Sequence, residues 1–281
     1  MDIDHFAKHL KLANFNGVTF HMEERMSLDL ALAQLKSDTA FSDILFWGKV
    51  NGTVKDYYVA LALDFANLDE GFPRKKFFWC SSSNFSFSAL PEVISKHVSK
   101  FEQMNTYFTG EYDRTLIEGV GPATVIDEDM GLILPPKSVT ELDRLSYVVH
   151  TIERSCQACP KGAFKLTPLH SVQRNEAFKG LSAEEAFEVK NWFHLRKLEH
   201  KDKVEQMQRN ESVYNNEFLD CVDKDLPAKA WSVLKDTTGT LATLRNSLWP
   251  GYYAFHKVRT NVYGSLYFGD GIRSNDLPFM L

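Results

Sequence analysis

Hydrophobic residues recur at helical spacing in the first part of the chain. Residues 3–14 and 22–38 each fit an amphipathic helix. In the second of these, Met22, Met26 and Leu30 follow one another at every fourth position and lead into further leucines. An apolar stripe at this spacing normally faces the interior of a globular protein, so we expect it to belong to the core.

After the second helix the pattern alternates with a period of two, which is typical of β-strands. Apolar residues fill 44–50 and 57–63, and Asn51-Gly52 between them is a strong signal for a hairpin turn. Both faces of both strands are largely apolar, so we expect other layers to cover the hairpin on both sides. The small alanines of the second strand would let a helix approach one of these faces closely.

The middle of the chain mixes strands, helices and loops. Capping boxes and a proline suited to a first helical turn mark the starts of its helices. The expected elements are a strand over Lys76–Cys80, a helix over Pro91–Phe108, a helix from Ser138-x-x-Glu141 to about Arg154, a helix from Ser182-x-x-Glu185 toward Trp192, and a charged, solvated segment over 199–216.

Four apolar runs separated by turn signals fill the last part of the chain, and they predict a β-meander. The runs are 229–236, 240–248, 251–258 and 261–268. Helices, a hairpin, a mixed middle and a terminal meander, in this order, indicate an α+β fold with a mainly antiparallel twisted sheet and flanking helices. We expect one domain over 1–281, with a helical segment at 1–40 and a sheet segment at 228–281.

Charge and composition exclude several classes of partner. The 281 residues carry a net charge of −5, which disfavours nucleic acid and anionic membrane surfaces as partners. No apolar run approaches the roughly 20 residues of a membrane span. Four cysteines are too few for a disulfide scaffold, and Met1-Asp2-Ile3-Asp4 lacks the positive region of a secretory signal. We therefore expect a reducing, cytosolic compartment.

A glycine-rich stretch near the end of the chain, NVYGSLYFGDG, invites comparison with a phosphate-binding loop. Gly264 and Gly269 have the spacing of that motif, but Asp270 stands where the motif needs lysine. A carboxylate there would repel a phosphate, and Pro278 interrupts the short segment that would have to form the receiving helix. The glycines are better interpreted as a close-packed strand position and a following turn.

Three further patterns fail as binding motifs at a named position. Gly119-Val120-Gly121-Pro122 lacks the third glycine of a dinucleotide site. His5 and His9 lack the glutamate of a zinc protease helix, and we expect them to form a surface pair. Asp127-Glu128-Asp129 has calcium-like charge, but Gly131 stands where an EF-hand needs Asp or Asn.

The motif Cys156-Gln157-Ala158-Cys159 could bind a metal or act in redox chemistry. His150 and His170 flank it, but a structural zinc site usually has two ligand pairs, and here there is one. A redox motif is expected at the start of a helix, whereas this one follows a predicted helix. Free thiols are the simplest interpretation, and a metal-binding or redox protein using Cys156 and Cys159 stays open as the alternative function.

Each local signature of an enzyme fails at a named position, so we expect a protein without catalytic residues, cofactor or metal. An enzyme of an unrecognised type would need a deep polar pocket with strongly shifted titratable groups. The chain carries instead two features of a binding protein. The strand 261–268 has one apolar face and one face with Tyr263 and Tyr267, and tyrosine is common at protein interfaces. The alternative, that these tyrosines pack under a helix of the same chain, stays open. The segment 277–281 is apolar, so we expect it to be docked in the chain's own core or on another chain.

Six stretches of the sequence are distinctive: LFWGKVNG, DYYVALAL, AFKGLS, WFHLRK, SLWPG, and YGSLYFGDG with the ending DLPFML. Together they resemble the radial spoke head protein 9 family of motile cilia and flagella. The resemblance runs over nearly the whole chain and is strongest at 44–63, 177–197 and 228–281. It gives no role to Cys156 and Cys159.

The resemblance implies a non-enzymatic subunit in the head of the radial spoke of the 9+2 axoneme, in the cytoplasmic cytoskeleton of the cilium. Family members pack with the related spoke head proteins 4 and 6. The head meets projections of the central pair and relays mechanical signals toward the dynein arms. We expect 249–281 to contribute to the contact with a related subunit. The expected interface residues are Trp249, Tyr252, Tyr263, Tyr267, Leu277, Phe279 and Leu281.

Overall fold

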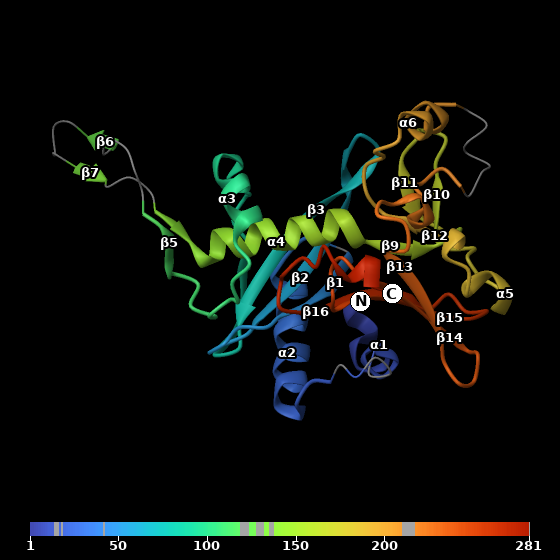
Figure 1. The fold of residues 1–281 in the computed structure, drawn as a ribbon, viewed down its shortest axis with the longest axis horizontal. Coiled ribbons are helices and arrows are strands. Elements are labelled where there is room, and N and C mark those ends of the chain that lie inside the picture. The colour runs from blue at the N-terminus through green and yellow to red at the C-terminus, as the bar shows by residue number, and fades with distance from the viewer. Residues whose placement is uncertain are drawn as a thin grey trace.

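A mixed sheet of eight strands forms the centre of the protein, in an α+β fold as the sequence predicts (Figure 1). The computed structural model describes residues 1–13, 17, 19–41, 43–118, 124–127, 132–134, 138–209 and 217–280. The strands lie in the order β13 (Trp231–Lys235), β14 (Leu241–Asn246), β15 (Tyr252–Lys257), β16 (Tyr263–Gly269), β1 (Asp43–Val50), β2 (Tyr57–Asp69), β3 (Phe72–Ser81) and β4 (Asn84–Ala89). All neighbours are antiparallel except β1 and β16, which run parallel.

Helices cover both faces of the β1–β2 hairpin, as the apolar pattern predicts (Figure 1). The helix α4 (Glu141–Cys156) lies on one face, and α1 (Phe6–Ala13) and α2 (Met22–Asp38) lie on the other. Because successive side chains of a strand point to opposite faces, β2 contributes to both layers. Tyr57, Val59, Leu61 and Leu63 join the cluster under α4, and Tyr58, Ala60 and Ala62 join the cluster under α1 and α2.

Short elements surround the sheet. The two-stranded pairs are β5 (Thr115–Ile117) with β8 (Val139–Thr140), β6 (Thr124–Asp127) with β7 (Leu132–Leu134), β9 (Ala158–Pro160) with β12 (Trp192–His194), and β10 (Phe164–Leu166) with β11 (Val172–Arg174). The further helices are α3 (Val98–Gln103), α5 (Ala183–Ala186), α6 (Lys201–Met207) and α7 (Leu277–Met280). Strands β9 to β12 enclose a third apolar cluster with Phe218 and Met207. Helix α6 lies within the charged segment 199–216 that the sequence predicts to be solvated, and 210–216 lie outside the described residues.

The seam between β1 and β16 joins the two halves of the sheet. Gly48 pairs with Tyr267, and Val50 pairs with Gly269. Where the two strands separate, the backbone of Met1 lies between them. Its amine donates to the carbonyl oxygens of Phe46 and Ser265 at 2.9 and 3.0 Å. The seam therefore connects the start, the first hairpin and the end of the chain.

The hairpin and the terminal meander confirm the predicted strands, but the turn between β1 and β2 differs from the prediction. Val50 pairs with Tyr57, so the connection has six residues rather than a two-residue turn at Asn51-Gly52. The amides of Thr53 and Val54 in this loop donate to the carbonyl oxygens of residues 108 and 109. A contact with a distant segment thus replaces the local turn.

The helix predicted over Pro91–Phe108 is wrong in most of its length. A 3₁₀ turn at 95–97 leads into α3, which ends at Gln103. Buried Arg144 donates to the carbonyl oxygens of Met104 and Thr106 at 3.1 and 2.6 Å. These carbonyls bind the guanidinium instead of continuing a helix, so a tertiary contact overrides the local pattern.

The start of α4 also differs from the prediction. The N-cap is Thr140, whose amide donates to Asp143 at 2.9 Å, so the capping box lies two residues after the predicted one. Glu141 is instead 1% exposed and accepts hydrogen bonds from residues 109–110 and from Tyr57. The second predicted box, at Ser182, is confirmed, although its helix ends at Ala186.

Candidate partner-binding surfaces

The glycine-rich stretch forms β16 and the turn after it. Asp270 accepts a hydrogen bond from the side chain of Asn51 at 3.0 Å. The amide of Gly271 donates to the Tyr267 hydroxyl at 2.8 Å, and its φ of +68° suits glycine. A Cβ on Gly271 would lie 2.7 Å from the Phe108 ring. The stretch is a strand and a tight turn, which confirms the interpretation of its glycines as backbone features.

Three of the predicted interface residues lie inside the core. Trp249, Tyr252 and Tyr267 are at most 5% exposed and belong to the cluster under α4. The Tyr252 hydroxyl accepts a hydrogen bond from the amide of Ala158 at 2.9 Å. The Tyr267 ring lies 5.3 Å from that of Trp47, centroid to centroid. Side chains of this chain therefore already cover these three rings, and they offer no outer surface to a partner.

The remaining predicted interface residues lie closer to the surface. Tyr263 is half-buried, with its ring against those of Phe164 and Phe178. In α7, Leu277 is half-buried, whereas Phe279 is 77% exposed. Met280 beside it is 76% exposed, and Leu281 lies outside the described residues. The end of α7 is thus an apolar surface that the chain's own core leaves open.

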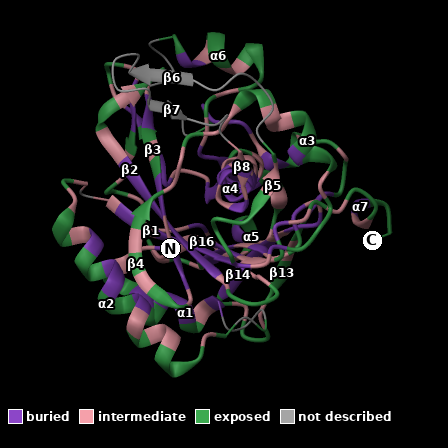
Figure 2. Cartoon of the chain, turned by 90° about the vertical axis from the view of Figure 1, so that its left-hand side faces the viewer, coloured by how far each residue is buried: buried purple, intermediate pink, exposed green. Residues whose placement is uncertain are grey.

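Helix α2 carries a second apolar surface, and here the sequence-based prediction is wrong. Met22, Met26 and Leu30 are 73%, 59% and 72% exposed, although their spacing suggested a core stripe. The core contacts of α2 come from Leu28, Leu32 and Leu35, which lie on the opposite side of the helix. Figure 2 shows α2 at the edge of the molecule, banded with buried and exposed positions. The signal that could have shown this is the presence of two apolar stripes on one helix.

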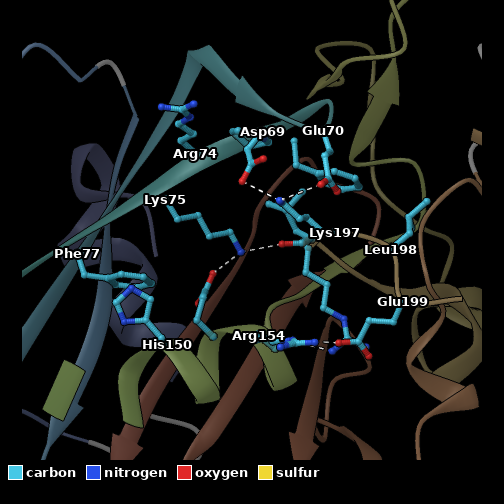
Figure 3. A pocket seen from close by; sticks show the side chains of 15 residues that line it. Asp69, Glu70, Arg74, Lys75, Phe77, His150, Arg154, Lys197, Leu198 and Glu199 are labelled. Atoms are coloured by element: carbon cyan, nitrogen blue, oxygen red, sulfur yellow. Dashed lines mark hydrogen bonds and ion pairs between the residues drawn. The ribbon is translucent and has the colours of Figure 1, made fainter. Parts of the chain in front are cut away.

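A cleft of about 760 Å³ opens between the β2–β3 hairpin, α4 and the segment after β12 (Figure 3). Ion pairs cross it. Lys75 binds Glu153 at 2.7 Å, Lys197 binds Asp69 at 2.8 Å, and Arg154 binds Glu199 at 3.1 Å. Glu70 also lies within 3.5 Å of Lys197, so each of the four carboxylates that line the cleft is paired with a cation.

The inner wall of the cleft is a buried network. Glu153 is 3% exposed and accepts hydrogen bonds from Lys75 and from the indole of Trp47, the latter at 2.9 Å. The His150 ring packs edge-on against Phe77, and burial lowers the pKa of this histidine below its usual range. The network links Trp47 of β1 and Lys75 of β3 to Glu153 of α4, so we expect it to stabilise the fold.

The cysteines of the CxxC motif are buried in different parts of the core. Cys156 lies in the cluster under α4, and Cys159 lies in the cluster enclosed by β9 to β12. Burial raises the pKa of Cys159 to about 12 and that of Cys156 well above its usual range, so both favour the thiol. Within the part of the chain that the structure describes, no three His, Cys, Asp or Glu side chains are grouped to hold a metal ion. His170 binds the carbonyl oxygen of Met207 instead.

We expect thiol labelling of the native protein to modify Cys221 well before the other three cysteines. Cys221 is half-buried, whereas Cys80, Cys156 and Cys159 are buried. Burial also raises the pKa of the Cys80 thiol to about 12, so little thiolate is present at neutral pH. Counting modified thiols by mass spectrometry at pH 7.5, before and after denaturation, tests this. Rapid modification of Cys156 or Cys159 in the folded protein would revive the redox alternative.

His9 is buried against the Phe255 ring rather than on the surface, which corrects the predicted surface pair with His5. Burial lowers the pKa of His9 to about 4. The segments Gly119-Val120-Gly121-Pro122 and 128–131 lie outside the described residues. In the described ranges, no helix combines the length and the apolar character needed to cross a bilayer.

Comparison with known proteins extends over the whole chain. Residues 1–64 match the family model described as "Radial spokehead-like protein". The chain is 31% identical over 288 residues to the human protein named "Radial spoke head protein 9 homolog", and 33% identical over 291 residues to the protein of the same name from Danio rerio. The Xenopus tropicalis protein of that name is 26% identical over 286 residues. In each case the match covers 100% of both chains.

The family model begins at Met1 and ends at residue 64, so it covers α1, α2, β1 and most of β2. The curated relatives extend the similarity through the meander and α7. The stretches LFWGKVNG and YGSLYFGDG, which carry the resemblance in the sequence, form the two strands of the parallel seam. Identity above 30% over the full length of both chains shows that this protein belongs to the radial spoke head protein 9 family.

Proposed function

We propose that this chain is a non-enzymatic structural subunit of the radial spoke head that supports mechanical signalling between the central pair and the dynein arms. The observation that carries the proposal is the full-length similarity to radial spoke head protein 9 homologues. The geometry agrees with a structural role, because the carboxylates that line the cleft beside α4 are paired with cations and the CxxC thiols are buried.

Membership of this family places the chain in the axoneme of cilia and flagella, as a component of the radial spoke and of the cytoskeleton. A fluorescently tagged chain produced in a multiciliated cell tests the proposal directly. We expect the tag to follow the axoneme along its length and to stay there after detergent removes the ciliary membrane. Extraction of the tag with the membrane and matrix would contradict a structural role in the spoke.

The partners that we propose are the related spoke head proteins 4 and 6, with the central pair as a transient contact. Exposed Phe279 and Met280 at the end of α7 supply an apolar surface for a stable contact with a related subunit. The net charge of −5 suits a weaker contact that forms and breaks, because electrostatic complementarity acts mainly on encounter rates.

We expect the double substitution Phe279→Ser and Met280→Ser to weaken assembly with a related spoke head subunit by at least about tenfold in affinity, as loss of two exposed apolar anchors from an interface does. Both side chains are largely exposed, so the fold of the isolated chain should be unaffected. Co-expression and pull-down with each partner, followed by calorimetry on the purified chain, measure the two effects. Removal of residues 277–281 should act in the same direction.

The matched control is Leu169→Ser, which removes an exposed apolar side chain, 88% exposed, from the turn between β10 and β11. It should leave assembly intact. If the α7 variant binds as tightly as the unchanged chain while the pull-down still recovers the partner, the contact lies elsewhere. Failure of the chain to reach the axoneme is a separate result and would count against the proposed function itself.

A further inference from the structure

Helix α2 has two apolar faces, and the sheet covers only one of them. Leu28, Leu32 and Leu35 are buried against the sheet. Met22, Met26 and Leu30 recur every fourth residue on the other side and are each more than half exposed. At 100° per residue, the centres of the two stripes lie on opposite sides of the helix. A contiguous apolar stripe left in water on a well-formed helix marks an interaction surface.

The charged residues of α2 divide between the same two sides. On the inner side, Glu24 accepts from the Tyr58 hydroxyl at 2.6 Å and pairs with Lys49. Beside the outer stripe lie Arg25 and Asp29, one helical turn apart along the same edge. In the described parts of the chain, neither of them forms an ion pair with another side chain. The outer face thus offers an apolar stripe with one unpaired cation and one unpaired anion at its edge.

We propose that this face binds α2 of a second copy of the chain in an antiparallel helix pair. A two-fold axis that passes through the outer face at the height of residue 28 places Met26 of one copy beside Leu30 of the second copy, and the reverse contact follows by symmetry. In an antiparallel pair, each edge of one helix lies against the same edge of the other helix. Arg25 of each copy therefore lies beside Asp29 of the second copy. The two unpaired charges are therefore satisfied twice, and the helix dipoles are opposed, which is favourable.

The charge pattern selects this pairing over a parallel one. In a parallel pair, opposite edges of the helices meet, and Asp29 would face the edge that carries Glu23, Ser27 and Gln34. That edge has no cation, so the anion would stay unpaired. The face is complementary to itself in the antiparallel direction, which is why we assign a second copy rather than an unrelated helix.

The size of the surface sets the strength of the contact. One pair of short helices buries less than about 1,200 Å² in total, which is the range of weak and transient complexes. We therefore expect a dissociation constant in the micromolar range for the isolated chain. Within a larger assembly that holds two copies near one another, the raised effective concentration would make the same contact stable.

Sedimentation velocity of the full chain over about 1 to 100 µM tests the proposal. The expected result is a concentration-dependent shift from monomer to dimer. Met26→Glu places a charge in the apolar contact and should raise the dimer dissociation constant at least about tenfold. Leu226→Glu alters an exposed leucine just before β13, at the opposite edge of the sheet from β4, which α2 contacts. This control should leave the dimer dissociation constant unchanged. A monomer at all concentrations, with the fold intact, would overturn the proposal.

Charge reversal tests the direction of the pair. Arg25→Asp and Asp29→Arg should each weaken the dimer, and the double variant should restore it, because the two residues then exchange roles across the same contact. Restoration is specific to the antiparallel self-pair. If the double variant is as weak as the single ones, α2 is bound by a different surface and the assignment is wrong.

Cysteine cross-linking gives an independent result. In a Cys221→Ser background, the single variants Met26→Cys and Leu30→Cys are prepared separately and then mixed under mild oxidation. The antiparallel pair predicts that the mixed disulfide between the two variants forms faster than either symmetric disulfide, since Met26 faces Leu30 of the second copy. Faster symmetric disulfides would indicate a parallel pair and contradict the proposal.

Discussion

Replacing Glu141 with alanine is expected to lower the free energy of unfolding by about 3–5 kcal/mol, because it leaves several buried donors without an acceptor. The carboxylate is 1% exposed. One oxygen accepts from the Tyr57 hydroxyl and the Gly110 amide, both at 2.8 Å. The other accepts from the Thr109 hydroxyl at 2.7 Å. Urea denaturation of the purified chain, followed by tryptophan fluorescence, measures the loss.

Glu141→Gln is the matched control for this prediction. Its amide oxygen can keep the bonds from Tyr57 and Gly110, and its amide nitrogen can donate to the Thr109 hydroxyl. We expect it to lose only about 1–2 kcal/mol. Gln keeps the side-chain volume and most of the hydrogen bonds, so its loss measures the contribution of the charge and of the second acceptor oxygen. Equal losses for both variants would contradict the prediction, because the retained hydrogen bonds would then contribute nothing.

Replacing Gly48 with alanine is the second change with a large expected effect, because it opens the seam of the sheet. An added Cβ would lie 2.0 Å from the carbonyl oxygen of Tyr267 and 2.8 Å from its amide nitrogen, which are backbone atoms of the neighbouring strand. Gly48 has a φ of +155°, which a side chain also disfavours. Clash and backbone strain together should lower the free energy of unfolding by about 3–5 kcal/mol.

The control for the seam is Gly264→Ala in β16. There the added Cβ meets the end of the Phe255 ring at 2.9 Å, and a side chain can shift where a strand backbone cannot. We expect a loss of about 1 kcal/mol. Thermal unfolding separates the two variants, with a drop of roughly 10 °C for Gly48→Ala. A Gly48→Ala protein as stable as Gly264→Ala would mean that the strands can separate here without loss.

Local patterns predicted the strands well because alternation and turn residues are local properties. The alternating pattern at 44–63 predicted β1 and β2, and the apolar character of both their faces predicted a covering layer on each side. The four runs after Lys229 gave the meander, since Thr238-Gly239 and Pro250-Gly251 mark its turns. What alternation does not record is which strand lies beside which. The parallel pairing of β1 with β16 joins segments about 219 residues apart, and no local turn sequence predicts it.

The errors come from side chains that act at a distance. Arg144 ends α3 by binding carbonyls some forty residues earlier in the chain. Glu141 resembled the acid of a capping box, but it is turned inward to bind Thr109. In both cases the residue type fits a local rule, and a buried tertiary partner decides its role. Only the assembled fold shows that partner.

Surface assignments failed for a different reason, namely that apolar spacing does not say which side of an element is covered. For the tyrosine-bearing face of β16 the sequence left an interface and packing under a helix open, and the structure places Tyr267 under α4. The stripe of Met22 and Met26 was predicted as core, but it is exposed. Exposure of Phe279 agrees with a segment that the chain's own core does not absorb. Hydrophobic spacing identifies faces, and the arrangement of layers decides which of them remain open.

The parallel seam has a consequence for synthesis in the cell. At 5–20 residues per second, about 10 to 45 s pass between the emergence of β1 from the ribosome and that of β16, its neighbour in the sheet. During this interval the edge of β1 that later pairs with β16 has no partner strand, and such an edge readily pairs with another chain. A premature stop anywhere before residue 263 would make that state permanent. Nascent chains and chains that stop before residue 263 should therefore depend on chaperones. Such truncations should act by removing the whole protein, whereas removal of 277–281 alters one surface only.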